Sequence, residues 1–168
     1  AACMDARKRA DREIPIHVSV TVETIGTLLI GSEVGAAIAA LSPFDLASLG
    51  LNCATGPTEM SPHVAYLAHH SPFPLSVLPN AGLPELVDGE TVYPLNETAF
   101  AEWLLRFVQE DGAVLVGGCC GTTPGHLAAA VQALDGAVPA EREPESRDLV
   151  SSIYRSVPLD QDTSVLIV

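Results

Sequence analysis

The sequence predicts an α/β fold in which helices cover a parallel sheet, and three observations support this prediction. Four short apolar segments begin near residues 16, 45, 74 and 113 and alternate with segments of helical character. These segments are continuously apolar, which is typical of parallel strands buried on both faces. The 168 residues, 48% of them hydrophobic, are enough to form one domain with a core. Both a doubly wound sheet of four or five strands and half of a (βα)₈ barrel fit this pattern.

Most of the expected helices begin at a recognisable signal. Ser32 can cap the first helix after a strand, because its side-chain oxygen can accept a hydrogen bond from a free N–H of the first turn. Pro62, after Ser61, and Pro124, after Thr123, are expected in the first turns of two others, where proline is favoured. The expected elements are the end of a helix at 1–13, strands at 16–22, 45–52, 74–78 and 113–118, helices at 33–41, 61–69, 97–110 and 124–134, and a long loop at 79–96.

The composition limits the partners that the chain can bind. Its 8 basic and 21 acidic residues give a net charge of -13, and so few cations cannot neutralise the phosphates of nucleic acids or anionic lipids. We therefore expect neither a nucleic acid nor a membrane as partner, and no apolar run is long enough to cross a bilayer. The chain does not begin with Met, which suggests a fragment, and its start lacks the pattern of a signal peptide.

Three of the four cysteines lie at the ends of predicted strands. Cys53 follows the second strand, and Cys119 and Cys120 follow the fourth, with glycines on both sides that allow the chain to bend. Thiolates suit zinc, and three of them leave one tetrahedral position open, which is typical of a catalytic site. The alternative is that these cysteines act as small core residues. Adjacent cysteines rarely form a disulfide with each other, which favours a reducing, cytoplasmic location.

Other polar residues at strand ends have both a functional and an ordinary interpretation. Asn80 follows the third strand and could offer its amide oxygen to zinc or to a substrate, or it could be a turn residue. Glu23, after the first strand, could meet a cationic group of a substrate or remain a solvated loop acid. His126 is expected to pack or bond locally at the start of a helix, and Cys3 to be a helix residue without a metal.

Three segments resemble those that mark the homocysteine S-methyltransferase family, namely GLNCATGP (50–57), PNAGLPE (79–85) and GGCCGTTPGH (117–126). The resemblance covers about 16–134 and is closest to the homocysteine-binding module of the cobalamin-dependent enzymes that make methionine. The tail at 151–168 resembles the connector that leads to their methyltetrahydrofolate barrel. The resemblance implies the C-terminal half, strands 5 to 8, of a (βα)₈ TIM barrel. It makes 1–134 the second half of the homocysteine-binding domain and 135–168 a linker towards a pterin-binding domain absent from this chain.

The resemblance also implies a reaction. Zinc held by Cys53, Cys119 and Cys120 binds the thiol of homocysteine, whose sulfur takes a methyl group from methylcobalamin to give methionine. Methylcobalamin, regenerated by 5-methyltetrahydrofolate, would be bound by other modules of the same polypeptide, so we expect this chain alone to be inactive. Two alternatives remain: a stand-alone enzyme that uses betaine or S-methylmethionine as donor, and a non-catalytic fragment in which zinc only braces strand ends.

Overall fold

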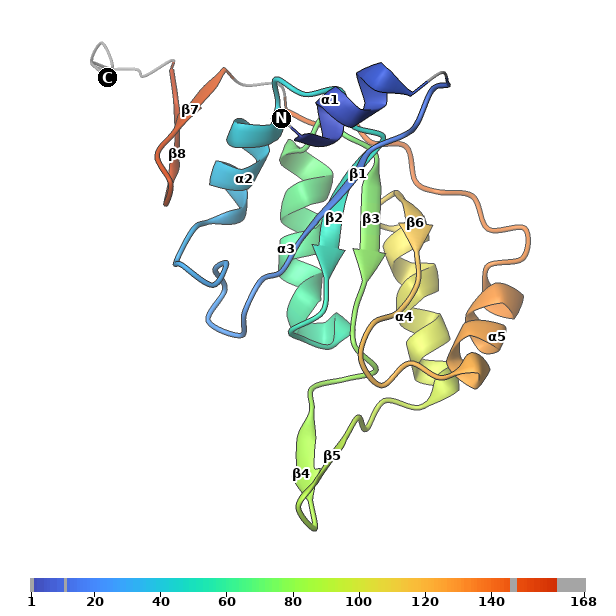
Figure 1. The fold of residues 1–168 in the computed structure, drawn as a ribbon. Helices are drawn as coiled ribbons and strands as arrows, with labels where there is room; N and C mark the ends of the chain where they lie inside the picture. Colours follow the sequence, from blue (N-terminus) through green and yellow to red (C-terminus); the bar gives the residue numbers. More distant parts are fainter. Residues whose placement is uncertain (1, 11, 146–147, 160–168) are drawn as a thin grey trace.

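The central element of the computed structural model is a four-stranded parallel sheet, and the structure describes residues 2–10, 12–145 and 148–159 (Figure 1). The strands follow one another across the sheet in chain order, with a shift in register where the last two pair. A doubly wound sheet reverses its strand order at a switch point, whereas this order is compatible with a sector of a barrel. The strands are β1 (His17–Val20), β2 (Ser48–Asn52), β3 (Leu75–Leu78) and β6 (Ala113–Val116).

Four helices lie in a row along one side of this sheet, and a fifth, α1, crosses the end at which the strands begin (Figure 1). In the row, α2 contacts α3, α3 contacts α4 and α4 contacts α5, while α3 and α4 pack on the strands. None of the helices in the described ranges combines the length and the apolar character needed to cross a membrane. The helices are α1 (Ala2–Arg9), α2 (Val34–Leu41), α3 (Pro57–His70), α4 (Glu97–Gln109) and α5 (Pro124–Ala133).

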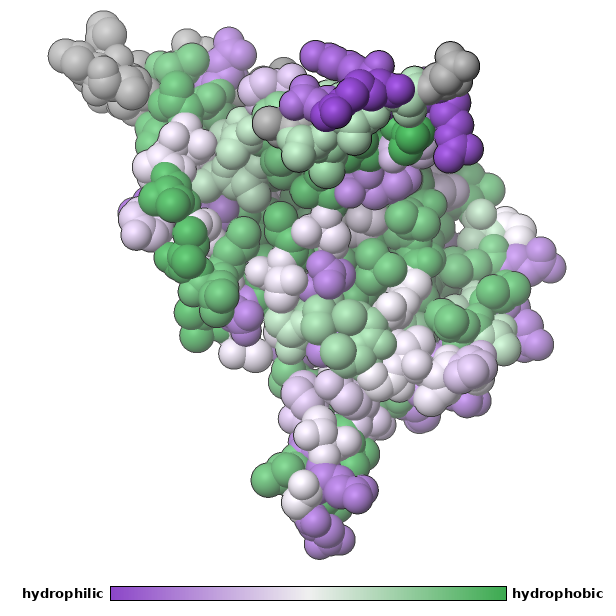
Figure 2. Space-filling model, viewed as in Figure 1, coloured by the Kyte–Doolittle hydropathy of each residue, from purple (hydrophilic) through white to green (hydrophobic). Residues whose placement is uncertain are grey.

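The core fills the space between the sheet and this row of helices. Its fully buried side chains come from both layers, because continuous apolar strands meet the apolar faces of amphipathic helices. The largest of them are Phe100, Phe107, Ile38, Leu49, Leu51, Leu67, Leu75 and Leu104. In contrast, the outer surface of α1 is hydrophilic, and hydrophobic residues gather over β6, at the open edge of the sheet (Figure 2).

Two antiparallel hairpins complete the described structure, formed by β4 (Glu85–Val87) with β5 (Glu90–Val92) and by β7 (Leu149–Ser151) with β8 (Ser156–Pro158). The β4–β5 hairpin extends away from the body at the end of the sheet where the strands stop (Figure 1). It lies within the segment predicted to be a loop, so that prediction was wrong there. The turn residues Asp88 and Gly89 have φ values of 52° and 84°. Positive φ at both central positions is typical of hairpin turns, and an Asp-Gly pair is a signal for one.

The start of α3 differs from the prediction. The helix begins at Pro57, with Gly56 as N-cap, so Pro62 lies inside it rather than in its first turn. The preference for proline at the first helical position holds, but for the earlier proline. Pro62 has no N–H and therefore removes one backbone hydrogen bond from the second turn.

The predicted caps had opposite outcomes. Thr123 caps α5 as expected, because its side chain accepts a hydrogen bond from the backbone N–H of His126. Ser32 does not cap α2: the N-cap residue is Glu33, and the hydroxyl of Ser32 donates instead to the carbonyl of Ile153. A partner far along the chain therefore replaces the local cap that the sequence suggested.

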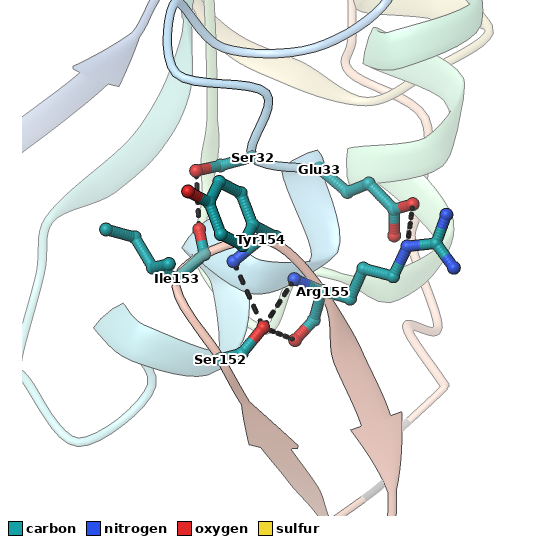
Figure 3. A network of polar contacts seen from close by, with 6 residues as sticks. All are labelled: Ser32, Glu33, Ser152, Ile153, Tyr154 and Arg155. Atoms are coloured by element: carbon teal, nitrogen blue, oxygen red, sulfur yellow. Dashed lines mark hydrogen bonds and ion pairs between the residues drawn. The ribbon is translucent and has the colours of Figure 1, made fainter.

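Contacts with the end of α3 and with α2 help to fix the segment after α5 to the helical side of the molecule. The Arg142 guanidinium donates four hydrogen bonds to carbonyls at the end of α3, those of Leu67, Ala68, Ser71 and Phe73. Further along, the β7–β8 hairpin packs on α2. Its turn accepts hydrogen bonds from Ser32 and from the backbone N–H of Glu33, and Arg155 forms an ion pair with Glu33 at 3.2 Å (Figure 3).

Candidate metal centre

Three thiols meet at the edge of the sheet where the strands end. The Sγ atom of Cys120 lies 3.5 Å from that of Cys53 and 3.9 Å from that of Cys119, and all three lie within 4.8 Å of one another. Sulfur ligands at about 2.3 Å from a tetrahedral zinc ion lie about 3.8 Å from each other. The donor type, the number of donors and their spacing therefore all fit zinc. Within the described ranges, no other cluster of three or more His, Cys, Asp or Glu side chains has the geometry of a metal site.

The loop that carries Cys53 has a strained backbone. Cys53 and Ala54 have φ values of 61° and 60°, in the left-handed region that residues other than glycine rarely adopt. The N–H of Cys53 donates to the carbonyl of Leu78, and the carbonyl of Thr55 accepts from the N–H of Asn80, so β3 and its loop hold this conformation. Strain of this kind persists where surrounding contacts enforce it, and it clusters at functional sites.

The segment after β3 also holds the other two cysteines. The N–H of Cys119 donates to the carbonyl of Pro79 at 2.9 Å, and the N–H of Ala81 donates to the carbonyl of Cys120 at 2.9 Å. Between these two bonds, the side-chain oxygen of Asn80 accepts from the N–H of Cys120 at 3.1 Å. Asn80 is buried, with 2% of its surface exposed. It therefore positions the Cys120 backbone, a role that the sequence did not predict, while its role as zinc or substrate ligand stays a prediction.

The thiols of this cluster differ in their pKa values. Burial raises the pKa of Cys53, but hydrogen bonds from the Ala54 backbone and from the thiols of Cys119 and Cys120 outweigh it, so its pKa lies below the usual value. Burial and the hydrogen bonds with the other two thiols raise the pKa of Cys119 to about 11. One thiol thus ionises at the expense of another, because negative charges this close repel one another. A divalent cation would remove that conflict.

The remaining predicted residues lie where their ordinary interpretations put them, apart from Glu23. Glu23 lies near enough to Cys53 for its charge to raise the pKa of that thiol, which places the carboxylate at the same edge of the sheet. Cys3 is exposed on α1 and does not join the cluster. His126 bonds locally, as predicted, with Nδ1 2.8 Å from the hydroxyl of Thr123 and Nε2 2.9 Å from the carbonyl of Leu95.

One residue at this site was not predicted. Tyr93 follows β5, and its ring lies against Gly121, next to Cys120. Burial, the neighbouring side chain of Cys120 and the charges of the three cysteines raise the pKa of Tyr93. The Asp-Gly turn signal between β4 and β5 could have revealed the hairpin, but not that its base returns to the cysteines.

Comparison with known proteins agrees with this site. The sequence profile of the homocysteine S-methyltransferase family matches residues 1–134. The chain is 47% identical over 171 residues to methionine synthase from Mycobacterium tuberculosis (strain ATCC 25618 / H37Rv) and 49% identical over 176 residues to methionine synthase from Mycobacterium leprae (strain TN). These alignments cover 100% of this chain but only 14% and 15% of the two relatives. The chain therefore belongs to the homocysteine S-methyltransferase family.

Proposed function

We propose that this chain is the zinc- and homocysteine-binding part of a methionine synthase. The observation that carries this proposal is the cluster of Cys53, Cys119 and Cys120, whose sulfur atoms lie within 4.8 Å of one another at the carboxyl edge of a parallel sheet. Functional groups of barrels and open α/β sheets lie at this edge. The family match and the two methionine synthase relatives add the substrate class, which is homocysteine as methyl acceptor.

The chain's residues have distinct roles in this proposal. Cys53, Cys119 and Cys120 would hold zinc and leave a fourth tetrahedral position for the substrate. Zinc bound there would lower the pKa of the homocysteine thiol, so that the thiol loses its proton and leaves a nucleophilic sulfur. Asn80 keeps Cys120 in place, and its side-chain oxygen has a second lone pair with which it could act as a weak ligand that homocysteine displaces.

We also propose that the methyl donor and half of the barrel lie elsewhere in a longer polypeptide. The four strands would be strands 5 to 8 of a (βα)₈ barrel, 135–168 would lead to a pterin-binding domain, and a cobalamin module would bring the methyl group as methylcobalamin. The small share of each relative that the chain spans supports this proposal. The four unpaired thiols are consistent with the predicted cytoplasmic location.

The test is methionine formation by the intact polypeptide to which this chain belongs. Cys119→Ala should lose both zinc and the homocysteine-dependent formation of methionine, because two sulfurs rarely hold zinc. Cys3→Ala, which removes a cysteine outside the cluster, should retain both. Zinc retention by Cys119→Ala would refute the three-cysteine site. Methyl transfer from betaine or S-methylmethionine without cobalamin would support the stand-alone alternative, and zinc binding without any methyl transfer would support a purely structural metal.

A further inference from the structure

The two loops that carry the cysteines start from strands that do not pair with each other. Cys53 follows β2 and Cys119 follows β6, and β3 lies between these strands in the sheet. Neighbouring strands lie about 4.8 Å apart, so the ends of β2 and β6 are about 10 Å apart. The sulfur atoms of Cys53 and Cys120 nevertheless approach to 3.5 Å. The two loops must therefore bend towards each other across the end of β3.

The segment after β3, residues 79–82, lies between these two loops and bonds to both. On one side, the N–H of Asn80 donates to the carbonyl of Thr55 at 3.1 Å. On the other side, the N–H of Ala81 donates to the carbonyl of Cys120 at 2.9 Å. We call this segment the spacer, because the distance of each loop from it decides how far apart the cysteines lie.

The loop of Cys53 and the spacer meet backbone to backbone. A Cβ atom added to Gly56 would lie 2.8 Å from Cα and 2.9 Å from the carbonyl carbon of Gly82. Carbon atoms in contact are about 3.5–4.0 Å apart, so a side chain at position 56 would push the two backbones apart by about 1 Å. Neither residue has a side chain that could move aside to absorb this shift.

This close approach explains the glycine at position 56 better than its backbone conformation does. Gly56 has a φ of -76° and a ψ of 174°, which other residues also adopt. It is the buried N-cap of α3, where Ser, Thr, Asn or Asp would offer a side-chain oxygen to the helix. The helix thus begins without a side-chain cap where a side chain would meet Gly82. At Gly82 itself, a φ of 95° favours glycine as well.

We propose that Gly56 and Gly82 are positioning residues of the metal centre, whose contact lets Cys53 come close enough to Cys119 and Cys120 for three sulfurs to bind one zinc ion. This inference rests on the proposed function, because it assumes that the three cysteines bind zinc. Metal–ligand distances vary by only about 0.2 Å around their usual values. A shift of the Cys53 loop by about 1 Å would therefore take its sulfur out of reach of the metal.

The variants Gly56→Ala and Gly56→Ser separate this contact from the stability of α3. Both add the Cβ atom that meets Gly82, but only serine has a side-chain oxygen that can cap the helix. Gly136→Ala is the control, because an added Cβ atom there has nothing within 4 Å, while its φ of 72° still strains the backbone.

All proteins are prepared as the intact polypeptide without cobalamin, and circular dichroism checks that they fold. Zinc affinity is measured by competition with a chromogenic chelator. The sulfur-to-metal absorption bands are recorded after loading with cobalt(II), because their intensity depends on how many sulfurs bind the metal. A loss of helix stability alone would not change these bands.

We expect both Gly56 variants to bind zinc about 10- to 100-fold more weakly and to lose intensity in the cobalt(II) bands. Gly136→Ala should match the unchanged protein in both measurements. Unchanged zinc affinity in Gly56→Ser would overturn the role of the contact, since any effect of Gly56→Ala would then come from the helix cap. An equal loss in Gly136→Ala would overturn it too. If the unchanged protein takes up no zinc, the proposed function fails, and the role of the two glycines fails with it.

Discussion

Three sulfur atoms within 4.8 Å of one another cannot all carry a negative charge unless a cation lies among them. Protons relieve part of this conflict, since the pKa of Cys53 is lowered and that of Cys119 is raised. The loop of Cys53 adds backbone strain to this electrostatic cost. At the scale of residues, the site is thus arranged for a cation, and binding of that cation must displace protons from the thiols.

Zinc uptake should therefore release protons. The thiol of Cys119, whose pKa is raised to about 11, is protonated near neutral pH and must lose its proton to bind the metal. Because protons compete with zinc, the affinity should fall as the pH falls, by about tenfold per pH unit for each proton released. Proton release can be followed with an indicator dye in weak buffer. Cys3→Ala should release as many protons as the unchanged chain, and a zinc affinity independent of pH would contradict this prediction.

The contact between Asn80 and Cys120 gives a second prediction at this scale. Asn80→Ala removes the acceptor of the Cys120 N–H and leaves a donor unpaired beside the cluster, so zinc affinity should fall about tenfold. Asn96→Ala is the control, because Asn96 caps α4 through the same kind of side-chain oxygen but lies outside the cluster. It should lower helix stability and leave zinc affinity unchanged. Equal zinc affinities for the two variants would show that Asn80 does not position Cys120.

The site residues differ in how far the sequence reveals them. Cys53, Cys119 and Cys120 could be predicted because each follows an apolar strand, and the ends of parallel strands share one edge of the sheet. The contact of Asn80 with Cys120 and the packing of Tyr93 on Gly121 could not, because they depend on the direction of one backbone N–H and on the return path of a hairpin. Neither property has a pattern in the residues themselves.

At the scale of elements, continuous apolar runs predict all four strands of the sheet. The two hairpins were missed because their strands are only three residues long. Every residue of β4 and β5 is exposed, so these two strands have no alternation of buried and exposed residues. The predicted start of α3 was too late, because Pro57 rather than Pro62 opens the helix. Local signals thus place elements but do not choose between two nearby prolines.

Arg142 connects the segment after α5 to the end of α3, and its removal should be costly. Arg142→Ala would leave four carbonyl acceptors without their donor, and we expect a loss of about 2 kcal/mol in the free energy of unfolding. Arg142→Lys should recover only part of it, because an ammonium group cannot reach four carbonyls at once. Urea unfolding measures the difference. Arg106→Ala, which removes an exposed ion pair with Glu110, is the control, and an equal effect of the two alanine variants would contradict the prediction.

At the scale of the whole molecule, the sheet has two open edges. Among the described strands, β1 and β6 each pair on one side only, and Val114 and Leu115 of β6 are 58% and 42% exposed. Unpaired edges and exposed apolar strand residues favour association with other chains. A complete barrel would pair both of these strand edges. The proposed half-barrel leaves them unpaired in this chain.

The isolated 168-residue chain should therefore self-associate, bind zinc weakly at best, and form no methionine from homocysteine and free methylcobalamin. Sedimentation velocity over a range of concentrations measures the association, and a methyl-transfer assay measures the activity. The intact polypeptide, which would supply the other half of the barrel, is the control and should be active. A stable and active monomer of this chain alone would show that its four strands are a self-sufficient fold.

Zinc X-ray absorption tests an open three-sulfur centre most directly, because it counts the sulfur atoms bound to the metal. Spectra of the zinc-loaded intact polypeptide are compared before and after homocysteine is added, with homoserine, which has a hydroxyl in place of the thiol, as control. We expect three sulfur ligands and one lighter atom at first, and four sulfurs once homocysteine takes the open position. Homoserine should leave the count at three. A sulfur count that homocysteine does not change would contradict a catalytic site built on Cys53, Cys119 and Cys120.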